Sequence, residues 1–228
     1  MSLRRPLRKN QRRANVRQTD ATVEPVSTDE LKTHLRIAED DDACEEEYLA
    51  GLITEARRWM EDETGIAFLS QTWTLSLDHW PAYHDAWWDG VRQMATTELY
   101  SQAPATPIIL PRYPAISLDT VTVYDEAGVS TAVTIADVFD VDVASRPARV
   151  ALKRGATWPT ASRSLNAIEL DYTAGWGTAV SDVPPSLRRA VLEMAAYMHT
   201  HRGDCTPEEG YTRSSAHSIL RTYRVREI

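Results

Sequence analysis

The chain has 228 residues, 43% of them hydrophobic, and a formal net charge of −8 at neutral pH. This length suits one domain, or one domain with a smaller one embedded in it, and the apolar content excludes wholesale disorder. No apolar run approaches the roughly 20 residues that a membrane span needs. Two cysteines, Cys44 and Cys205, are too few for a disulfide framework and are expected to be reduced.

The charge is segregated along the chain. Residues 1–18 contain no acidic residue, while the rest of the chain has 18 basic and 33 acidic residues, a charge of −15. We therefore predict a basic N-terminal arm over residues 1–25 that contacts DNA phosphates or an acidic protein surface, although a solvated leader is an open alternative. It lacks the apolar stretch of a secretion signal. The basic residues are Arg4, Arg5, Arg8, Lys9, Arg12, Arg13 and Arg17.

Helical patterns fill residues 26–69. Ser27 and Glu30 have the spacing of a capping box at a helix start. An acidic run from Glu39 to Glu47 lacks the glycine and ligand spacing of a calcium loop, so Asp42 and Glu45 are interpreted as helix caps. Gly65 is expected to end this second helix. Its apolar stripe is Leu49, Leu52, Ile53, Ala56, Trp59 and Met60.

Residues 70–178 change to a strand period. Trp73, Leu75 and Leu77 alternate with polar residues, and Val121 and Val123 precede a turn near Gly128 that predicts a hairpin. Further strands are expected in "DVFDVDV", "ARVALK" and "NAIELDYT".

An aromatic loop is predicted over residues 79–106. Its aromatic side chains fit a protein interface, a local apolar cluster or a sugar-stacking site, and the sequence does not decide between them. They are Trp80, Tyr83, Trp87 and Trp88.

Helix returns over residues 179–213, where Pro184 and Pro185 suit a first helical turn. Its apolar stripe is Leu187, Ala190, Val191, Met194 and Met198. Residues 214–228 are expected to form a short helix and an extended tail. The predicted fold class is α+β: a helical body of about four helices, with an all-β domain inserted between the second and third main helices.

Catalytic and metal-binding patterns are weak. Gly175 and Gly177 start a dinucleotide-type motif, but the next helix begins too late to hold phosphate, so a backbone corner covered by Trp176 is favoured. His199 and His201 point to different helix faces, which disfavours a metal site with Cys205. No nucleophile is paired with a base. We therefore expect no catalytic residue, metal or cofactor.

Several segments in order resemble the head-to-tail connector (adaptor) proteins of tailed bacteriophages and gene-transfer particles. The resemblance extends from about residue 27 to 225, and neither the arm nor residues 82–105 belong to it. The matching segments are "LKTHLRI", "EARRWMEDETG", "SQTWTLSLDHWP", "ILPRYPAISLDTVTVYDEAG", "SRPARV", "NAIELDYTAGWG", "VPPSLRRAVLEMAAYM" and "LRTYRV".

The resemblance implies a non-enzymatic virion protein of the neck, assembled in the host bacterial cytoplasm. It implies a ring, usually of twelve copies, that sits under the portal protein, extends the channel for packaged DNA and carries the next component: a stopper, tail terminator or tail tube. No membrane is involved. An alternative function is a carbohydrate-binding module that uses the tryptophan-rich loop. By the resemblance, the portal-docking residues of segment 214–228 are Leu220, Arg221, Tyr223, Arg224, Val225, Arg226 and Ile228.

Overall fold

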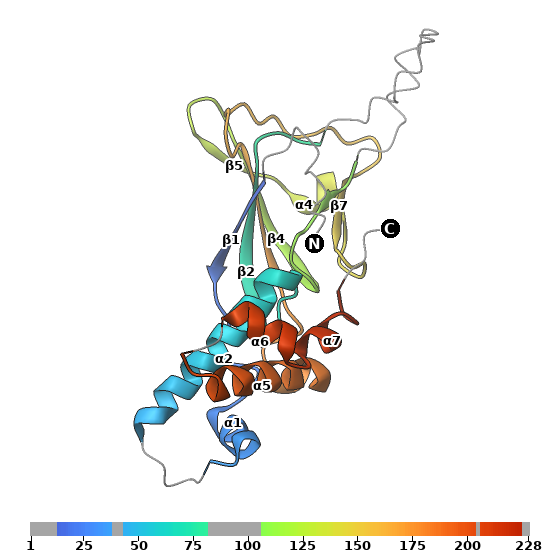
Figure 1. Cartoon of the computed structure of the whole chain (residues 1–228). Coiled ribbons are helices and arrows are strands. Elements are labelled where there is room, and N and C mark those ends of the chain that lie inside the picture. The colour runs from blue at the N-terminus through green and yellow to red at the C-terminus, as the bar shows by residue number, and fades with distance from the viewer. Residues whose placement is uncertain (1–12, 38–42, 82–105, 204–205, 225–228) are drawn as a thin grey trace, which may run out of the picture. The chain divides into compact units, whose positions relative to one another are not determined.

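A computed structural model describes residues 13–37, 43–81, 106–203 and 206–224 (Figure 1). The chain divides into two compact units. The sheet unit comprises Met1–Gln18, Thr72–Pro111 and Ser117–Thr173, and the helical unit comprises Thr19–Gln71, Arg112–Ile116 and Ala174–Ile228. The predicted α+β class is confirmed.

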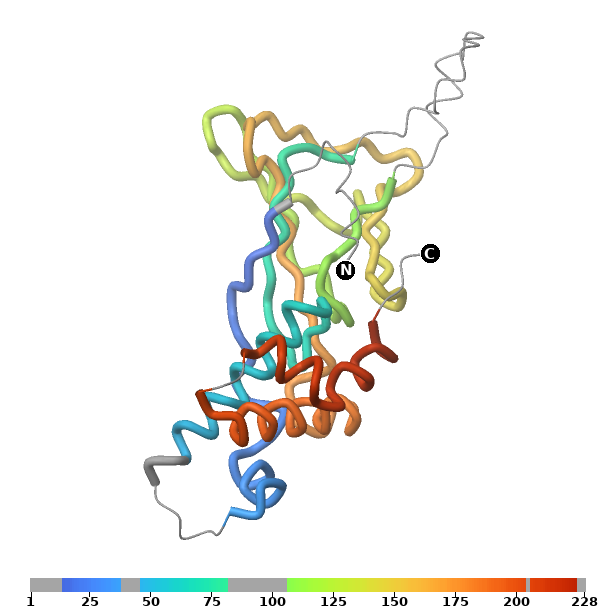
Figure 2. The backbone as a smooth tube through the Cα atoms, in the orientation of Figure 1, coloured from blue at the N-terminus to red at the C-terminus, as the bar shows by residue number. Residues whose placement is uncertain are grey.

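The helical unit is built around one central helix. Helix α5 (Pro185–Thr200) packs against α1 (Thr28–Leu35), α2 (Ala43–Thr64), α6 (Pro207–Arg213) and α7 (Ala216–Leu220). Figure 2 shows α6 and α7 lying alongside α5. The short helix η1 (Val180–Asp182) precedes α5. The core of this unit includes Leu31, Leu49, Ile53, Met60, Phe68, Leu187, Val191, Met194 and Leu220.

The helix ends follow the predicted chemistry. Ser27 Oγ accepts the backbone N–H of Glu30 at 3.1 Å, and a Glu30 carboxylate oxygen accepts the N–H of Ser27 at 3.1 Å, so the capping box is confirmed. Gly65, at φ 79°, ends α2 and donates to the carbonyl of Glu61. Pro185 opens α5. Of the predicted caps, Asp42 lies outside the described residues, and Glu45 lies in α2 but its side chain is not described.

Strands of the larger sheet follow the order β1-β2-β8-β4-β5. Strands β4 and β5 form the predicted antiparallel hairpin, with Gly128 at φ 82° in its turn. Trp73, Leu75 and Leu77 of β2 are buried as expected. The strands are β1 (Arg13–Thr19), β2 (Gln71–Leu77), β4 (Ala115–Tyr124), β5 (Ser130–Ala132) and β8 (Ile168–Ala174).

A second sheet has the order β3-β7-β6. It is antiparallel, with Val150 of β7 (Arg149–Leu152) opposite Val141 of β6 (Phe139–Asp142) and Ile108 of β3 (Ile108–Ile109). The one-turn helix α4 (Ile135–Val138), which the sequence pattern did not predict, precedes β6. Within the described ranges, no helix is long and apolar enough to cross a membrane.

Strand β1 corrects the predicted arm, which was expected to reach residue 25. Asn15 Oδ1 accepts the hydroxyl of Tyr172 at 2.9 Å, and the Arg17 guanidinium lies 4.8 Å from the ring centre of Trp73. These partners lie far away in the sequence, so local composition could not reveal them. Only residues 1–12 of the arm lie outside the described part.

Helix α6 lies within residues 179–213, which were expected to be helical, but a separate helix starting at Pro207 was not predicted. Thr206 and Glu209 form a second capping box, and Tyr211 is buried against the core. The spacing of Thr206 and Glu209 was the available signal. A single apolar side chain in a short polar segment is too weak a periodic pattern to predict a helix.

Candidate functional site

The predicted docking segment begins inside the helical unit. Leu220, the last residue of α7, has no exposed surface and belongs to the core. Its carbonyl accepts the backbone N–H groups of Tyr223 and Arg224, each at 3.0 Å. The chain therefore continues in a helical turn through residue 224, and the predicted extended form is wrong there. Spacing of three residues places Leu220 and Tyr223 on one side of the turn.

Tyr223 is held by the start of α5. Its hydroxyl lies 2.5 Å from Ser186 Oγ, within hydrogen-bonding distance, and its ring meets Trp176 edge-on with the ring centres 6.2 Å apart. Both Tyr223 and Trp176 are half-buried against the core. We call Tyr223, Ser186 and Trp176 the Tyr223 anchor.

The Gly-Trp-Gly stretch explains why Trp176 occupies this position. Gly175 has φ 143°, and a Cβ there would lie 2.3 Å from the carbonyl oxygen of Leu69. Only glycine allows the chain to turn so close to the Leu69 backbone. Nearby, Gly177 accepts the backbone N–H of Ser70 at 2.8 Å. The predicted corner, with Trp176 packed over it, is therefore confirmed.

The predicted docking residues separate into three groups. Leu220 and Tyr223 are turned towards their own unit, whereas Arg221 and Arg224 are exposed. Val225, Arg226 and Ile228 lie outside the described part. A partner could reach the two arginines directly, while Leu220 holds the segment in place from within the core.

A buried arginine in α2 escaped the sequence analysis. The Arg57 side chain is only 1% exposed, and its five N–H groups make five hydrogen bonds to three carboxylates. Glu24 accepts two of them at 2.7 and 3.1 Å, Asp20 accepts two at 3.0 and 3.3 Å, and Glu61 accepts one at 3.0 Å. The network therefore ties the segment after β1 to the middle of α2.

Glu61 extends the network towards β2. It is fully buried, and its other carboxylate oxygen accepts the backbone N–H of Phe68 at 3.0 Å and the side-chain amide of Gln71 at 2.6 Å. Arg57 and Glu61 follow Ile53 at four-residue steps on the apolar face of α2. That spacing was the signal for a buried ion pair, but Asp20 and Glu24 could not be chosen as partners from the sequence.

Electrostatics favour the charged form of this network. Burial alone would raise the pKa of Asp20, but hydrogen bonds from Arg57 and Arg58 hold that pKa well below its ordinary value. Burial would lower the pKa of Arg57, but the bonds to Glu24 and the charge of Glu61 raise it further above its ordinary value. Asp20 is therefore ionised in the folded protein through the neutral and mildly acidic range.

The aromatic candidates are only partly described. Trp80 stacks on Trp158 with ring centres 4.6 Å apart, lies 5.7 Å from Phe139 and donates from Nε1 to the Pro159 carbonyl at 2.7 Å. For Trp80, the structure therefore shows the local apolar cluster, one of the three alternatives that the sequence left open. Tyr83, Trp87 and Trp88 lie outside the described part.

Among the residues predicted to make basic contacts, the structure describes the side chain of Arg17, which packs over Trp73. Arg13 begins β1, but its side chain lies outside the described part. Arg4, Arg5, Arg8, Lys9 and Arg12 lie outside the described residues.

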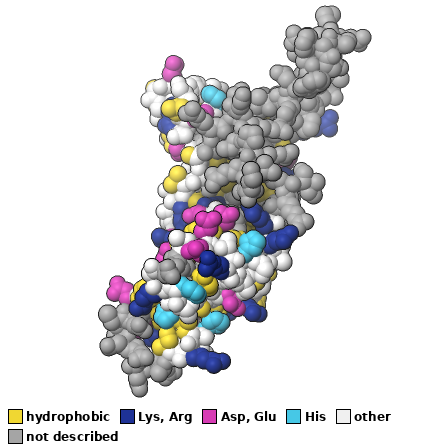
Figure 3. Space-filling model, in the orientation of Figure 1, with side chains coloured by type: hydrophobic (Ala, Val, Ile, Leu, Met, Phe, Trp, Pro, Cys, Tyr) yellow, Lys and Arg dark blue, Asp and Glu magenta, His cyan; other side chains and the backbone are white. Residues whose placement is uncertain are grey.

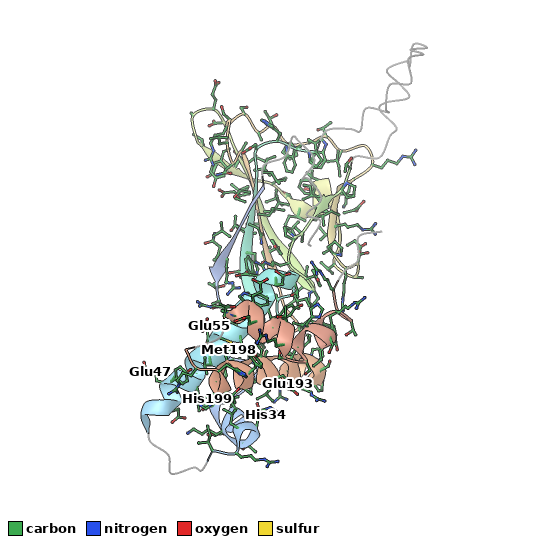
Figure 4. All side chains as sticks on the ribbon, viewed as in Figure 1. His34, Glu47, Glu55, Glu193, Met198 and His199 are labelled. Atoms are coloured by element: carbon green, nitrogen blue, oxygen red, sulfur yellow. The ribbon has the colours of Figure 1, made fainter. Side chains whose placement is uncertain are left out.

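His199 of α5 and His201, which follows the last residue of that helix, have different neighbours. Figure 4 labels side chains from α1, α2 and α5, among them His34 and His199. The ring of His199 lies 6.2 Å from that of Tyr48, whereas His201 stacks on Tyr197 with ring centres 4.0 Å apart. No group of three or more potential ligands among the described residues could hold a metal ion. Figure 3 shows charged and histidine side chains interspersed over this face of the helical unit.

No protein-family model and no curated protein matches the chain. Chains of solved structures do match it. One is described as the neck of an empty gene transfer agent particle computed with C6 symmetry: identity is 21%, the TM-score is 0.69, and the match covers 94% of this chain and 97% of that one.

A second match is to a chain of the virion of a native gene transfer agent particle, with 20% identity, a TM-score of 0.70 and coverage of 94% and 96%. A third is to the neck of a native particle computed with C12 symmetry, with 22% identity, a TM-score of 0.62 and coverage of 93% and 97%. The chain therefore has the fold of chains found in gene transfer agent particles. This agrees with the resemblance of its segments to head-to-tail connectors.

Proposed function

We propose that this protein is a structural, non-enzymatic subunit of the neck of a phage-like particle, where it acts as the head-to-tail connector. The observation that carries this proposal is the extent of the structural match, which covers 93–94% of this chain and 96–97% of the gene transfer agent chains. Because the match leaves out almost none of either chain, it accounts for both units.

The proposed assembly is a ring of twelve copies under the portal protein, with packaged DNA in its lumen and the next tail or neck component on its far side. Two of the matching chains come from necks computed with C6 and C12 symmetry, which supports a ring. A ring requires heterologous contacts, in which one face of each subunit meets a different face of the next. We assign the ring body to the helical unit and the periphery to the inserted β domain.

In this proposal the subunit joins the portal through its C-terminal segment. The exposed Arg221 and Arg224 carry positive charge and are followed in the sequence by Val225, Arg226 and Ile228. Such a segment suits an acidic groove with apolar pockets. Twelve equivalent segments on one ring bind with avidity, so each single contact can be weak.

Truncation tests this docking site. Removing residues 224–228 leaves Leu220 and Tyr223 in place, so we expect a folded subunit with an unchanged melting temperature that no longer binds purified cognate portal rings. Removing residues 219–228 would also take Leu220 out of the core, so loss of binding by that variant would be uninformative. Wild-type portal binding by the shorter truncation would contradict the assignment of the docking site.

The basic arm has a separate test. We propose that Arg4, Arg5, Arg8, Lys9 and Arg12 contact packaged DNA or an acidic neighbour, because residues 1–18 have no acidic residue while the rest of the chain has a charge of −15. Changing all five to glutamine should lower the fraction of particles that retain DNA. Changing Arg149, which is paired with Asp142, to glutamine is the control and should leave retention unaltered.

The alternative, a carbohydrate-binding module, gains no support from Trp80. That ring already stacks on Trp158 and packs near Phe139, so it is not arranged as an open platform for a sugar.

A further inference from the structure

The Tyr223 anchor holds the turn that leads into the proposed docking residues. The described chain approaches the proposed docking residues through a turn fixed at three points: Leu220 in the core, the Tyr223 hydroxyl at Ser186, and the Tyr223 ring against the edge of Trp176. Two of the three contacts are made by one side chain. Residue 224 is therefore presented from a fixed position at the start of α5.

We propose that Tyr223 is a positioning residue that holds the root of the docking segment, residues 221–224, on its own subunit before the portal is bound. This inference rests on the proposed function. An unanchored segment would lose the freedom of Arg221, Thr222, Tyr223 and Arg224 on binding, and each immobilised residue costs binding free energy. Anchoring removes most of that cost before docking.

The anchor is rigid because the backbone on both sides of Trp176 is held in place. Trp176 lies between Gly175, which is pressed against the backbone of Leu69, and Gly177, whose carbonyl accepts the N–H of Ser70. Ser186 lies in the first turn of α5, directly after Pro185. Ser186 and Trp176, which contact the Tyr223 side chain, lie outside the C-terminal segment, so the anchor fixes that segment against independent elements of the helical unit.

The first test measures the anchor itself, by trypsin cleavage after Arg221 in the full-length protein. Tyr223→Phe and Ser186→Ala each remove the same hydrogen bond, so each should raise the cleavage rate by roughly 3- to 10-fold, because cleavage follows the population of the opened segment. The double variant should be cleaved no faster than either single variant. Ser218→Ala, which removes a hydroxyl that donates to the Ser215 carbonyl at the start of α7, is the matched control and should be cleaved like the wild type.

Additive rates in the double variant would show that Tyr223 and Ser186 do not act together, and would overturn the anchor. Unchanged rates in both single variants would overturn it equally.

The second test measures docking to purified cognate portal rings. Tyr223→Ala removes the hydroxyl and the ring, and we expect the dissociation constant to rise at least about 10-fold while the melting temperature of the helical unit changes little, since the ring is only half-buried. If Tyr223→Ala proves unfolded, Tyr223→Phe supplies the docking measurement, with a smaller expected rise.

Two failures are distinguishable. A folded Tyr223→Ala variant that is cleaved rapidly after Arg221 but binds portal as tightly as the wild type would overturn the positioning role, and the docking site would stand. Portal binding that survives removal of residues 224–228 would overturn the docking site itself, whatever the Tyr223 variants do.

Discussion

Replacing Arg57 by methionine should lower the free energy of unfolding by about 3–5 kcal/mol, one of the two largest losses we expect from a single substitution in this protein. Methionine fills similar space but supplies no donor, so the fully buried Glu61 carboxylate would lose the guanidinium of Arg57. Asp20 and Glu24 would lose two hydrogen bonds each. The shift of the urea midpoint, with the m value compared between variants, measures the loss.

The adjacent residue provides the control. Arg58 also pairs with Asp20, at 2.6 Å, but its side chain is 55% exposed. Exposed ion pairs contribute little, so Arg58→Met should cost about 1 kcal/mol or less. Equal losses for the two variants would show that burial of the Arg57 network does not determine its contribution.

The same network makes stability depend on pH. Because the pKa of Asp20 is lower in the folded protein than in the unfolded chain, its contribution is present above the ordinary carboxyl pKa of about 4 and declines as the pH falls below it. In Asp20→Asn this part of the acid dependence should be absent. The unfolding midpoints of the wild type and of Asp20→Asn should therefore converge as the pH is lowered from neutral to about 3. A difference between the two midpoints that stays constant over this range would count against an ionised Asp20.

Replacing Gly175 by alanine should lower the free energy of unfolding by at least about 3 kcal/mol. The new Cβ would lie 2.3, 2.4 and 2.6 Å from backbone atoms of Leu69 and Ser70, which cannot move aside as a flexible side chain can. A φ of 143° adds strain for any residue with a Cβ. Displacement of Trp176 should also appear as a change in tryptophan fluorescence.

Gly51 is the matched control, because it lies within α2 and a Cβ there would meet no atom within 4 Å. Gly51→Ala should raise the free energy of unfolding by about 0.5–1 kcal/mol through the better helix propensity of alanine. If Gly175→Ala were as stable as the wild type, the close approach between residues 175 and 69 would not exist in solution.

Local patterns in the sequence determined much of this protein. The period of apolar residues identified α2, α5 and β2, and cap chemistry located the start of α1 at Ser27 and the end of α2 at Gly65. The glycines at 175 and 177 were interpreted correctly as a corner. Each of these features depends on neighbours within a few residues, so the sequence contains the whole signal.

Features that depend on contacts between residues far apart in the sequence were decided only by the tertiary structure. Residues 13–19 have the composition of a basic arm, yet they form an edge strand because Asn15 meets Tyr172 and Arg17 meets Trp73. The tail after Leu220 was expected to be extended, but residues 220–224 form a helical turn in which Tyr223 contacts Ser186 and Trp176. The spacing of Arg57 and Glu61 indicates an ion pair on α2, but only folding brought Asp20 and Glu24 to Arg57. A pattern over a few residues indicates which face a segment buries. The contact between Arg57 and Asp20 spans 37 positions and that between Tyr172 and Asn15 spans 157, so both depend on how the whole chain packs.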